Sequence, residues 1–155
     1  ANGPQHFNVP AWRSQGYREA LAAAGIEGRS IWERDGAFTA AGGELAMTAL
    51  LSQPGGAPTA VFCQSDEMAF GALRALRHSG LRCPEDISVV GLDDHELAYT
   101  FDLTTVAQPV AEQGAAAARW LLEQLDPGQE WDDTADVAFH EVRLVLRGST
   151  GPPPS

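Results

Sequence analysis

The chain has 155 residues, 44% of them hydrophobic and 20% charged, which is an ordinary balance for a globular protein with a substantial core. Its formal net charge is −11 and its ten basic residues are all arginines scattered along the chain, so the composition argues against direct binding of a nucleic acid. No apolar run reaches the ~18 residues of a membrane span. Two cysteines are too few for a disulfide framework, and Cys63, in a buried-strand pattern, is expected to be a reduced core thiol.

The first third of the chain alternates helical and extended patterns. Apolar residues at helical spacing predict a helix over residues 10–24, with Pro10 tolerated in its first turn. The predicted apolar face of this helix comprises Trp12, Tyr17, Ala20, Leu21 and Ala24. Residues 29–33 form a short strand candidate, and Thr39 is placed to cap a second helix that runs to residue 51.

The middle of the chain contains a strand, a helix and a second strand. Residues 59–64 and 87–92 are apolar runs typical of buried strands, and residues 66–80 between them carry an apolar stripe at helical spacing. This order predicts a right-handed βαβ unit. Asp66 and the pair Asp93–Asp94 then follow the carboxyl ends of their strands, where open α/β sheets bind ligands.

The last third of the chain continues the alternation. An extended segment at residues 104–106 precedes a helix over residues 109–125, an acidic loop at residues 130–136 and an alternating edge strand at residues 139–147. The proline-rich end, residues 148–155, is expected to be disordered. The whole pattern predicts an α/β fold of three layers, with a mostly parallel sheet and helices on both faces.

Two segments carry a specific resemblance to a known family. The sequence SDEMAFGALRALRHSGLRCPEDISVVGLDD at residues 65–94, followed by TTVAQPV at residues 104–110, resembles the effector-binding domain of the LacI/GalR family of bacterial transcription regulators. A weaker likeness extends from residue 13 to the R-G-S-T segment at residues 147–150. The resemblance implies a periplasmic-binding-protein-like fold of two lobes, with a small-molecule effector in the cleft between them.

The same resemblance implies a domain organisation. Residues 1–106 resemble the C-terminal lobe without its first helix and strand, and residues 107–127 a crossover helix that packs on the other lobe. Residues 128–147 resemble an acidic loop and a return strand, and residues 148–155 a disordered tail. The chain therefore resembles a fragment that lacks the helix-turn-helix headpiece. Such a protein is a cytoplasmic homodimer that binds operator DNA through its headpieces.

Three residues match effector contacts of the family. Asp93, the first acid of G-L-D-D, can accept hydrogen bonds from sugar hydroxyls, and the alternative is a loop-capping carboxylate without a ligand. Arg13, in an R-x-x-G segment, offers a rigid fork of donors, and the alternative is a surface arginine on a helix. Phe38 matches an aromatic position that stacks on the effector, and the alternative is a core phenylalanine.

Three further residues are expected to bind the ligand at the same rim, formed by the carboxyl ends of the strands. Ser65 is placed to donate to the ligand, and Gln108 is placed to reach the cleft from the crossover, with a hinge residue as the alternative. Phe7 matches a position that varies with the ligand. The lack of a polar group at Phe7 favours a sugar-like effector over a charged or purine-type one.

An apolar set in and after the central unit matches the region where family members pair as homodimers. These residues are Met68, Leu97, Tyr99 and Phe101. A two-fold interface would use the same patch on both subunits. The alternative is packing inside the chain.

Enzyme signatures are absent from the sequence, which contains no G-x-S-x-G, H-E-x-x-H, C-x-x-C or G-x-G-x-x-G motif. No catalytic residue, metal ligand or cofactor is therefore expected. The leading hypothesis is the sensing domain of a LacI/GalR-like regulator with a sugar-like effector. The alternative is a sugar-binding protein of a transport system with the same fold.

Overall fold

The computed structural model describes residues 8–28, 30–125 and 139–154 of the chain. Phe7 and the acidic loop expected at residues 130–136 lie outside the described residues. The elements in chain order are α1 (Asn8–Ala23), η1 (Ser30–Trp32), α2 (Ala40–Leu51), β1 (Ala60–Phe62), α3 (Asp66–His78), β2 (Ser88–Asp93), α4 (Glu96–Thr100), β3 (Thr104–Ala107), α5 (Val110–Gln124) and β4 (Arg143–Val145).

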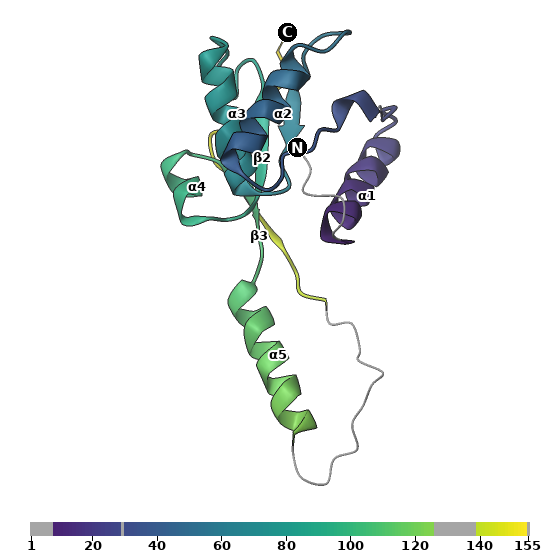
Figure 1. Ribbon diagram of the computed structural model, residues 1–155, viewed down its shortest axis with the longest axis vertical. Helices are drawn as coiled ribbons and strands as arrows, with labels where there is room; N and C mark the ends of the chain where they lie inside the picture. Colours follow the sequence, from purple (N-terminus) through teal and green to yellow (C-terminus); the bar gives the residue numbers. More distant parts are fainter. Residues whose placement is uncertain (1–7, 29, 126–138, 155) are drawn as a thin grey trace.

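The strands form one sheet in the order β1–β2–β3–β4 (Figure 1). β1, β2 and β3 run parallel, in a register that pairs Val61 with Val89 and Val90 with Thr104, and β4 runs antiparallel to β3. The predicted α/β class with a mostly parallel sheet is confirmed. Because β1, β2 and β3 are parallel, their carboxyl ends lie together at one end of the sheet.

Helix α3 joins β1 to β2 and packs beside the sheet. Ser65 caps it, because the Ser65 hydroxyl accepts a hydrogen bond from the Met68 amide at 3.3 Å. Acidic residues stand in its first turn and basic residues in its last, as the helix dipole favours. The residues that α3 buries are Asp66, Met68, Ala69, Gly71, Ala72, Ala75 and Leu76.

Two glycines allow α2 and α3 to cross closely. A Cβ atom at Gly43 would overlap the backbone carbonyl of Met68, and a Cβ atom at Gly71 would overlap that of Ala40. Gly43 therefore has a packing role that offsets its low helix propensity. The close crossing completes a core formed by Ala46, Met47, Leu50, Val61, Cys63, Met68, Ala69, Ala72, Ala75, Leu76, Ile87, Val89, Ala98 and Leu103. Cys63 is a free, buried thiol, as predicted.

The apolar face predicted for α1 is only partly covered: Tyr17 and Leu21 are half-buried, whereas Trp12, Ala20 and Ala24 are exposed. Trp12 is 67% exposed, whereas Pro10 and Ser14 are buried. The buried side chain of Gln64, just beyond β1, donates to Pro10 O at 3.2 Å and to Ser14 Oγ at 3.0 Å. The prediction was wrong for Trp12 because these two hydrogen bonds orient the helix.

The strand expected at residues 29–33 is not formed over the described residues of that segment. Ser30–Trp32 is a 3-10 turn, in which Glu33 N donates to Ser30 O at 3.1 Å. A local bond of this kind satisfies a backbone group that a strand would pair with a neighbour. The apolar composition of the segment did not distinguish the two outcomes.

The expectation of a disordered tail from residue 148 is wrong for its first residues. Ser149 is only 4% exposed. Its Oγ donates to Val89 O at 2.6 Å and accepts from Thr104 N at 2.8 Å, and its carbonyl accepts from Val89 N at 2.8 Å. Ser149 thus joins β2 to β3, because it bonds to backbone groups of both strands. The proline-rich composition of the tail did not indicate this role.

Helix α5 extends away from the other elements, whereas β4 pairs with β3 at the edge of the sheet (Figure 1). We call residues 108–125 and 139–142 the arm, and residues 36–107 the body; β3 and β4 join the two. α5 buries none of its described residues, and its exposed large apolar side chains include Val110, Trp120, Leu121 and Leu122. The edge strand predicted over residues 139–147 is present only as β4, and Val142, Leu144 and Leu146 of the predicted segment are exposed.

Candidate functional site

The turn after β2 places Asp93 at the carboxyl end of the sheet. Asp94 has φ 55°, in the left-handed region where Asp is more frequent than most residues. Asp93 has φ 125°, outside that region, in a conformation that residues other than glycine rarely adopt. Asp93 Oδ1 accepts a hydrogen bond from Gln108 Nε2 at 2.7 Å. Because Gln108 directly follows β3, which pairs with β2, the two side chains come from adjacent strand ends.

Arg13 reaches the same end of the sheet from α1. Its Nη1 donates to Gln64 O at 2.7 Å, just beyond β1. Its guanidinium carbon lies 6.0 Å from the centroid of the Phe38 ring, at the outer limit of a cation–π contact. The structure therefore brings Arg13, Phe38, Asp93 and Gln108 together, and their contact with a ligand stays a prediction.

The surroundings shift the pKa values of both charged groups in this cluster, Arg13 and Asp93. Partial burial raises the pKa of the Asp93 carboxyl, although the residue as a whole is exposed, and the Arg13 charge and the Gln108 hydrogen bond act in the opposite direction. Partial burial lowers the pKa of the Arg13 guanidinium, and the Asp93 charge opposes this shift. Because arginine stays protonated in proteins, the cluster presents one cation and one partly desolvated carboxyl group.

Phe38 belongs to the core and to the cluster at once. It packs against the buried core, with Arg13 over its ring. Ala37 and Phe38 both have positive φ, 51° and 55°, and the turn is held by a hydrogen bond from Ala37 N to Asp35 Oδ1 at 2.8 Å. The two interpretations of Phe38, as a core residue and as a site residue, are therefore compatible.

A buried hydrogen-bond network supports the Asp93–Asp94 turn. Asp66 Oδ1 accepts from Thr105 Oγ1 at 2.6 Å, and Asp66 Oδ2 accepts from His95 N at 2.8 Å. Thr105 Oγ1 in turn accepts from Asp94 N at 3.3 Å. Asp66 is 1% exposed and Thr105 is fully buried, so these bonds are shielded from competing water.

Ser65 lies beneath the rim where the sequence places it. It is 6% exposed and caps α3, and its contact with a ligand stays a prediction. Phe7 is outside the described residues. Sequence reasoning missed Gln64 and Thr105, which position Arg13 and the Asp93–Asp94 turn. The available signal at Gln64 was a polar residue at the end of an apolar strand run.

The residues expected at a homodimer interface divide into two groups. Met68 is fully buried inside the core, so its prediction as an interface residue is wrong: the face of α3 that carries it packs within the chain. Leu97, Tyr99 and Phe101 are 42%, 81% and 47% exposed. Phe101 stacks on Phe70 with ring centroids 4.8 Å apart, which fixes one side of this exposed group.

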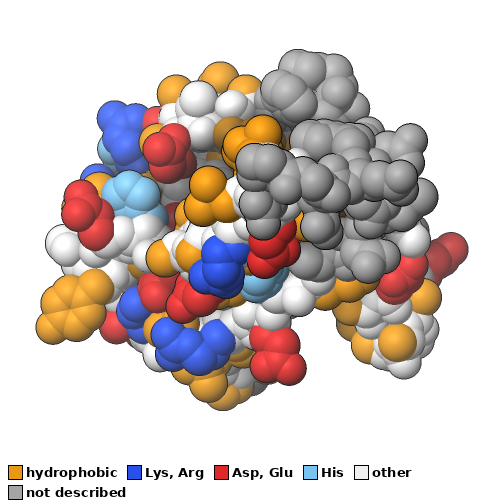
Figure 2. Space-filling model, turned by 90° about the horizontal axis from the view of Figure 1, so that it is seen from below, with side chains coloured by type: hydrophobic (Ala, Val, Ile, Leu, Met, Phe, Trp, Pro, Cys, Tyr) orange, Lys and Arg blue, Asp and Glu red, His pale blue; other side chains and the backbone are white. Residues whose placement is uncertain are grey.

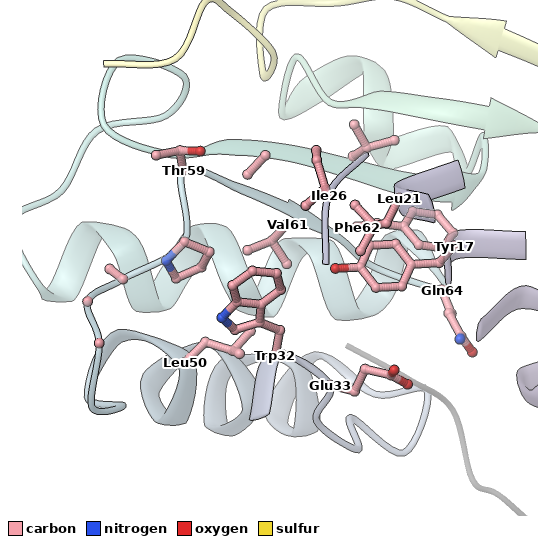
Figure 3. Close-up of a pocket in the computed structure, with 16 residues that line it drawn as sticks. Tyr17, Leu21, Ile26, Trp32, Glu33, Leu50, Thr59, Val61, Phe62 and Gln64 are labelled. Atoms are coloured by element: carbon pink, nitrogen blue, oxygen red, sulfur yellow. The ribbon is translucent and has the colours of Figure 1, made fainter. Parts of the chain in front are cut away.

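A cavity lies along β1, between α1, η1 and α2 (Figure 3). Its volume is about 520 Å³, and its lining is mainly apolar, with Tyr17 from α1, Trp32 from η1 and Leu50 from α2. Gln64 borders both the cavity and the cluster. We place the candidate site at the cluster, because orientation of a polar ligand requires converging polar groups.

On the part of the surface that Figure 2 colours, arginine and acidic side chains lie interspersed with apolar ones. Across residues 8–28, 30–125 and 139–154, no three His, Cys, Asp or Glu side chains are grouped to hold a metal ion. The described helices also include none that is both long and apolar enough to cross a lipid bilayer.

Comparison with known proteins identifies the family. A family model described as a periplasmic binding protein-like domain matches residues 1–150. The chain belongs to this family. The HTH-type transcriptional repressor CytR of Escherichia coli (strain K12) is 41% identical over 150 residues, which cover 96% of this chain and 43% of the repressor.

Solved structures give the same result. A transcriptional regulator CelR–cellobiose complex aligns with a TM-score of 0.87 and 39% identity, over 96% of this chain and 45% of that one. A LacI family transcriptional regulator from Enterococcus faecium with bound ribose aligns with a TM-score of 0.79 and 34% identity, over 94% of this chain and 52% of that one. The resemblance to LacI-type regulators is confirmed. The chain spans about half the length of these relatives, which are named as transcription regulators.

Proposed function

We propose that this chain carries the effector site of a LacI/GalR-type transcription regulator, and that the effector is a sugar held by Asp93, Arg13, Phe38 and Gln108. The observation that carries the proposal is the convergence of these side chains at the carboxyl ends of parallel strands. The sugars cellobiose and ribose in the names of two similar structures support the ligand class.

The chemistry of the cluster suits a polyhydroxylated ligand. The Asp93 carboxylate accepts hydrogen bonds from hydroxyls, and the Arg13 guanidinium donates to hydroxyl or ring oxygens. The Phe38 ring offers an apolar surface to the C–H face of a sugar ring. The ligand would share the Asp93 carboxylate with Gln108, whose amide already donates to it at 2.7 Å.

The remaining parts of the proposal concern the whole protein. A sugar that binds one inter-lobe geometry more tightly than the other shifts the population toward it, and this shift changes DNA binding by headpieces outside the chain. The exposed faces of α5 and β4 would pack on the second lobe. Leu97, Tyr99 and Phe101 would form part of a homodimer interface. Such a regulator acts in the cytoplasm, requires no cofactor and catalyses no reaction.

The first test is a thermal-shift screen of the protein expressed from its complete gene, with cellobiose, D-ribose and a panel of nucleosides. A ligand that binds the folded state raises the midpoint by mass action. We expect Asp93→Asn to weaken binding of the responding sugar about 10–100-fold, because a hydrogen bond to a charged group contributes about 1.5–3 kcal/mol. Asparagine has nearly the same size and branching as aspartate, so the substitution changes the backbone strain at this position little.

Asp102→Asn is the matched control. Asp102 is also exposed and has positive φ, 50°, but it lies before β3, at the other end of the sheet. Its substitution should leave the sugar response unchanged. A response to nucleosides alone would contradict the sugar class, and an undiminished sugar response in Asp93→Asn would contradict the role of Asp93. Sugar-dependent binding of the complete protein to DNA upstream of its gene separates a regulator from a transport protein.

A further inference from the structure

The two strands that join the body to the arm each contact one of the paired aspartates. Gln108, directly after β3, donates to Asp93 Oδ1 at 2.7 Å. Arg147, two residues after β4, donates through Nη2 to Asp94 Oδ1 at 2.8 Å. β3 and β4 pair along Thr105–Ala107 and run together toward the arm (Figure 1). The Asp93–Asp94 turn therefore connects the candidate effector site to both strands.

Arg147 is held in place by several bonds besides its ion pair. Its Nη1 donates to Leu103 O at 2.8 Å, and its backbone N donates to Thr104 Oγ1 at 2.9 Å. Only 17% of the Arg147 side chain and 26% of the Asp94 side chain are exposed. A guanidinium with two fixed acceptors loses less side-chain freedom per bond than a mobile surface cation, so this ion pair has a defined geometry.

The turn needs such support because of its backbone. Successive positive φ values at Asp93 and Asp94 cost free energy and persist where surrounding contacts fix them. Thr105 and Asp66 hold the amides of Asp94 and His95 from the interior of the sheet. Arg147 holds the Asp94 carboxylate, and it is attached to the strand that returns from the arm.

We propose that Arg147 is a positioning residue for effector binding. By holding Asp94, it keeps the neighbouring Asp93 carboxylate directed at Arg13 and Gln108. A displacement of β4 relative to β3 moves Arg147 and loosens the turn, so the position of the arm changes effector affinity, and effector binding favours one position of the arm in return. This regulation rests on the proposed role of Asp93 in effector binding.

Hydrogen exchange of the complete protein tests the positioning without any ligand. In Arg147→Gln and in Asp94→Asn, we expect the Asp94 and His95 amides to exchange about tenfold faster, with less than about a twofold change at the Cys63 and Ser88 amides of the sheet. Arg143→Gln removes the same charge from an exposed position on β4 and should change neither group. Turn amides that keep their wild-type rates, or an equal acceleration throughout the sheet, would overturn the inference.

Titration with cellobiose and D-ribose tests the consequence for binding. For a sugar that the wild type binds, we expect Arg147→Gln to raise Kd about tenfold. The double variant with Asp94→Asn should add little, because Arg147→Gln has already removed the ion pair that Asp94→Asn would weaken. Arg147→Lys should regain part of the loss. Equal Kd values for wild type and Arg147→Gln would refute the positioning role. If the wild type binds neither sugar, the proposed ligand class fails, and hydrogen exchange alone decides whether Arg147 holds the turn.

Discussion

Helices α3 and α5 are similar in length, at 13 and 15 residues, and both carry apolar residues at helical spacing, but they differ in what those residues contact. α3 buries seven residues against the sheet and α2. α5 buries none of its described residues and extends from the body (Figure 1). An amphipathic pattern thus identifies a helix and its apolar face, whereas the partner of that face depends on elements elsewhere in the protein.

The two helices also differ at their first turns. α3 begins with the Ser65 cap, whereas Pro109 at the start of α5 provides no side-chain cap bond. Isolated helices of this length are marginal in water. Because α5 also lacks a side-chain cap, it depends on packing against a partner more than α3 does. The body is therefore expected to hold the Asp93 turn, while the arm changes position relative to it.

The largest expected effect comes from filling the close crossing of α2 and α3. Gly71→Ala places a Cβ against the backbone carbonyl of Ala40, which cannot move without shifting α2. We expect a loss of about 2–4 kcal/mol in the free energy of unfolding, measured by urea denaturation.

The same substitution in α5 is the control and should have the opposite sign. A Cβ at Gly114 meets nothing within 4 Å among the described atoms, and alanine is the better helix former. Gly114→Ala should therefore stabilise α5 locally by about 0.5–1 kcal/mol, which circular dichroism of helix content can detect. Equal destabilisation by both substitutions would show that α5 is as tightly packed as α3.

The sequence predicted those parts of the body whose local pattern and packing agree. β1, α3 and β2 follow from apolar periodicity and from the Ser65 cap, and their order places Asp93 at a strand end. Met68 was misjudged because helical spacing does not distinguish a face packed against α2 from one at the surface. For α1, the hydrogen bonds of Gln64 decided the orientation.

The candidate site was predictable to the same extent. The family resemblance pointed to Asp93, Arg13 and Phe38, and the place of Gln108 at the crossover pointed to the fourth residue. These four side chains converge in the structure. The supporting contacts were not predictable, because they join residues far apart in the sequence. The Asp66–Thr105 bond spans 39 residues, and no local pattern specifies such a pair.

An intermediate effect is expected from the network beneath the turn. Thr105→Val keeps the shape of the side chain but removes the donor to Asp66 and the acceptor for Asp94 N. Because these groups remain buried without their partner, the loss should be about 1–3 kcal/mol, measured by urea denaturation. The Thr48 hydroxyl makes an exposed bond to Glu44 O, so Thr48→Val should cost under about 0.5 kcal/mol. A similar cost for both would contradict a supporting role for the network.

A smaller effect is expected at the start of α3. Ser65→Ala removes the oxygen that accepts from Met68 N, and the loss of such a cap costs about 1 kcal/mol. Thermal unfolding measures the change. Ser65→Thr retains a capping oxygen and should recover most of the stability. If Ser65→Ala leaves the thermal midpoint unchanged, the first turn of α3 does not depend on its cap.

The smallest effect concerns Asp93, where the body meets the arm. Burial, together with the charges of Asp66 and Glu67, raises the pKa of its carboxyl in the folded protein more than Arg13 and Gln108 lower it. Between the ordinary pKa of aspartate and this raised value, the folded state binds more protons than the unfolded state, so Asp93 makes stability fall as the pH rises through that window. Asp93→Asn removes this dependence and should be the more stable protein at neutral pH. Because Asp93 is solvent-exposed as a residue, screening limits the gain in the free energy of unfolding to less than about 1 kcal/mol.

Urea denaturation of both proteins from about pH 3 to 7 measures the difference in the free energy of unfolding, which should vanish toward the acidic end. A difference that instead favours the wild type at neutral pH would mean that its attraction to Arg13 outweighs the loss of water.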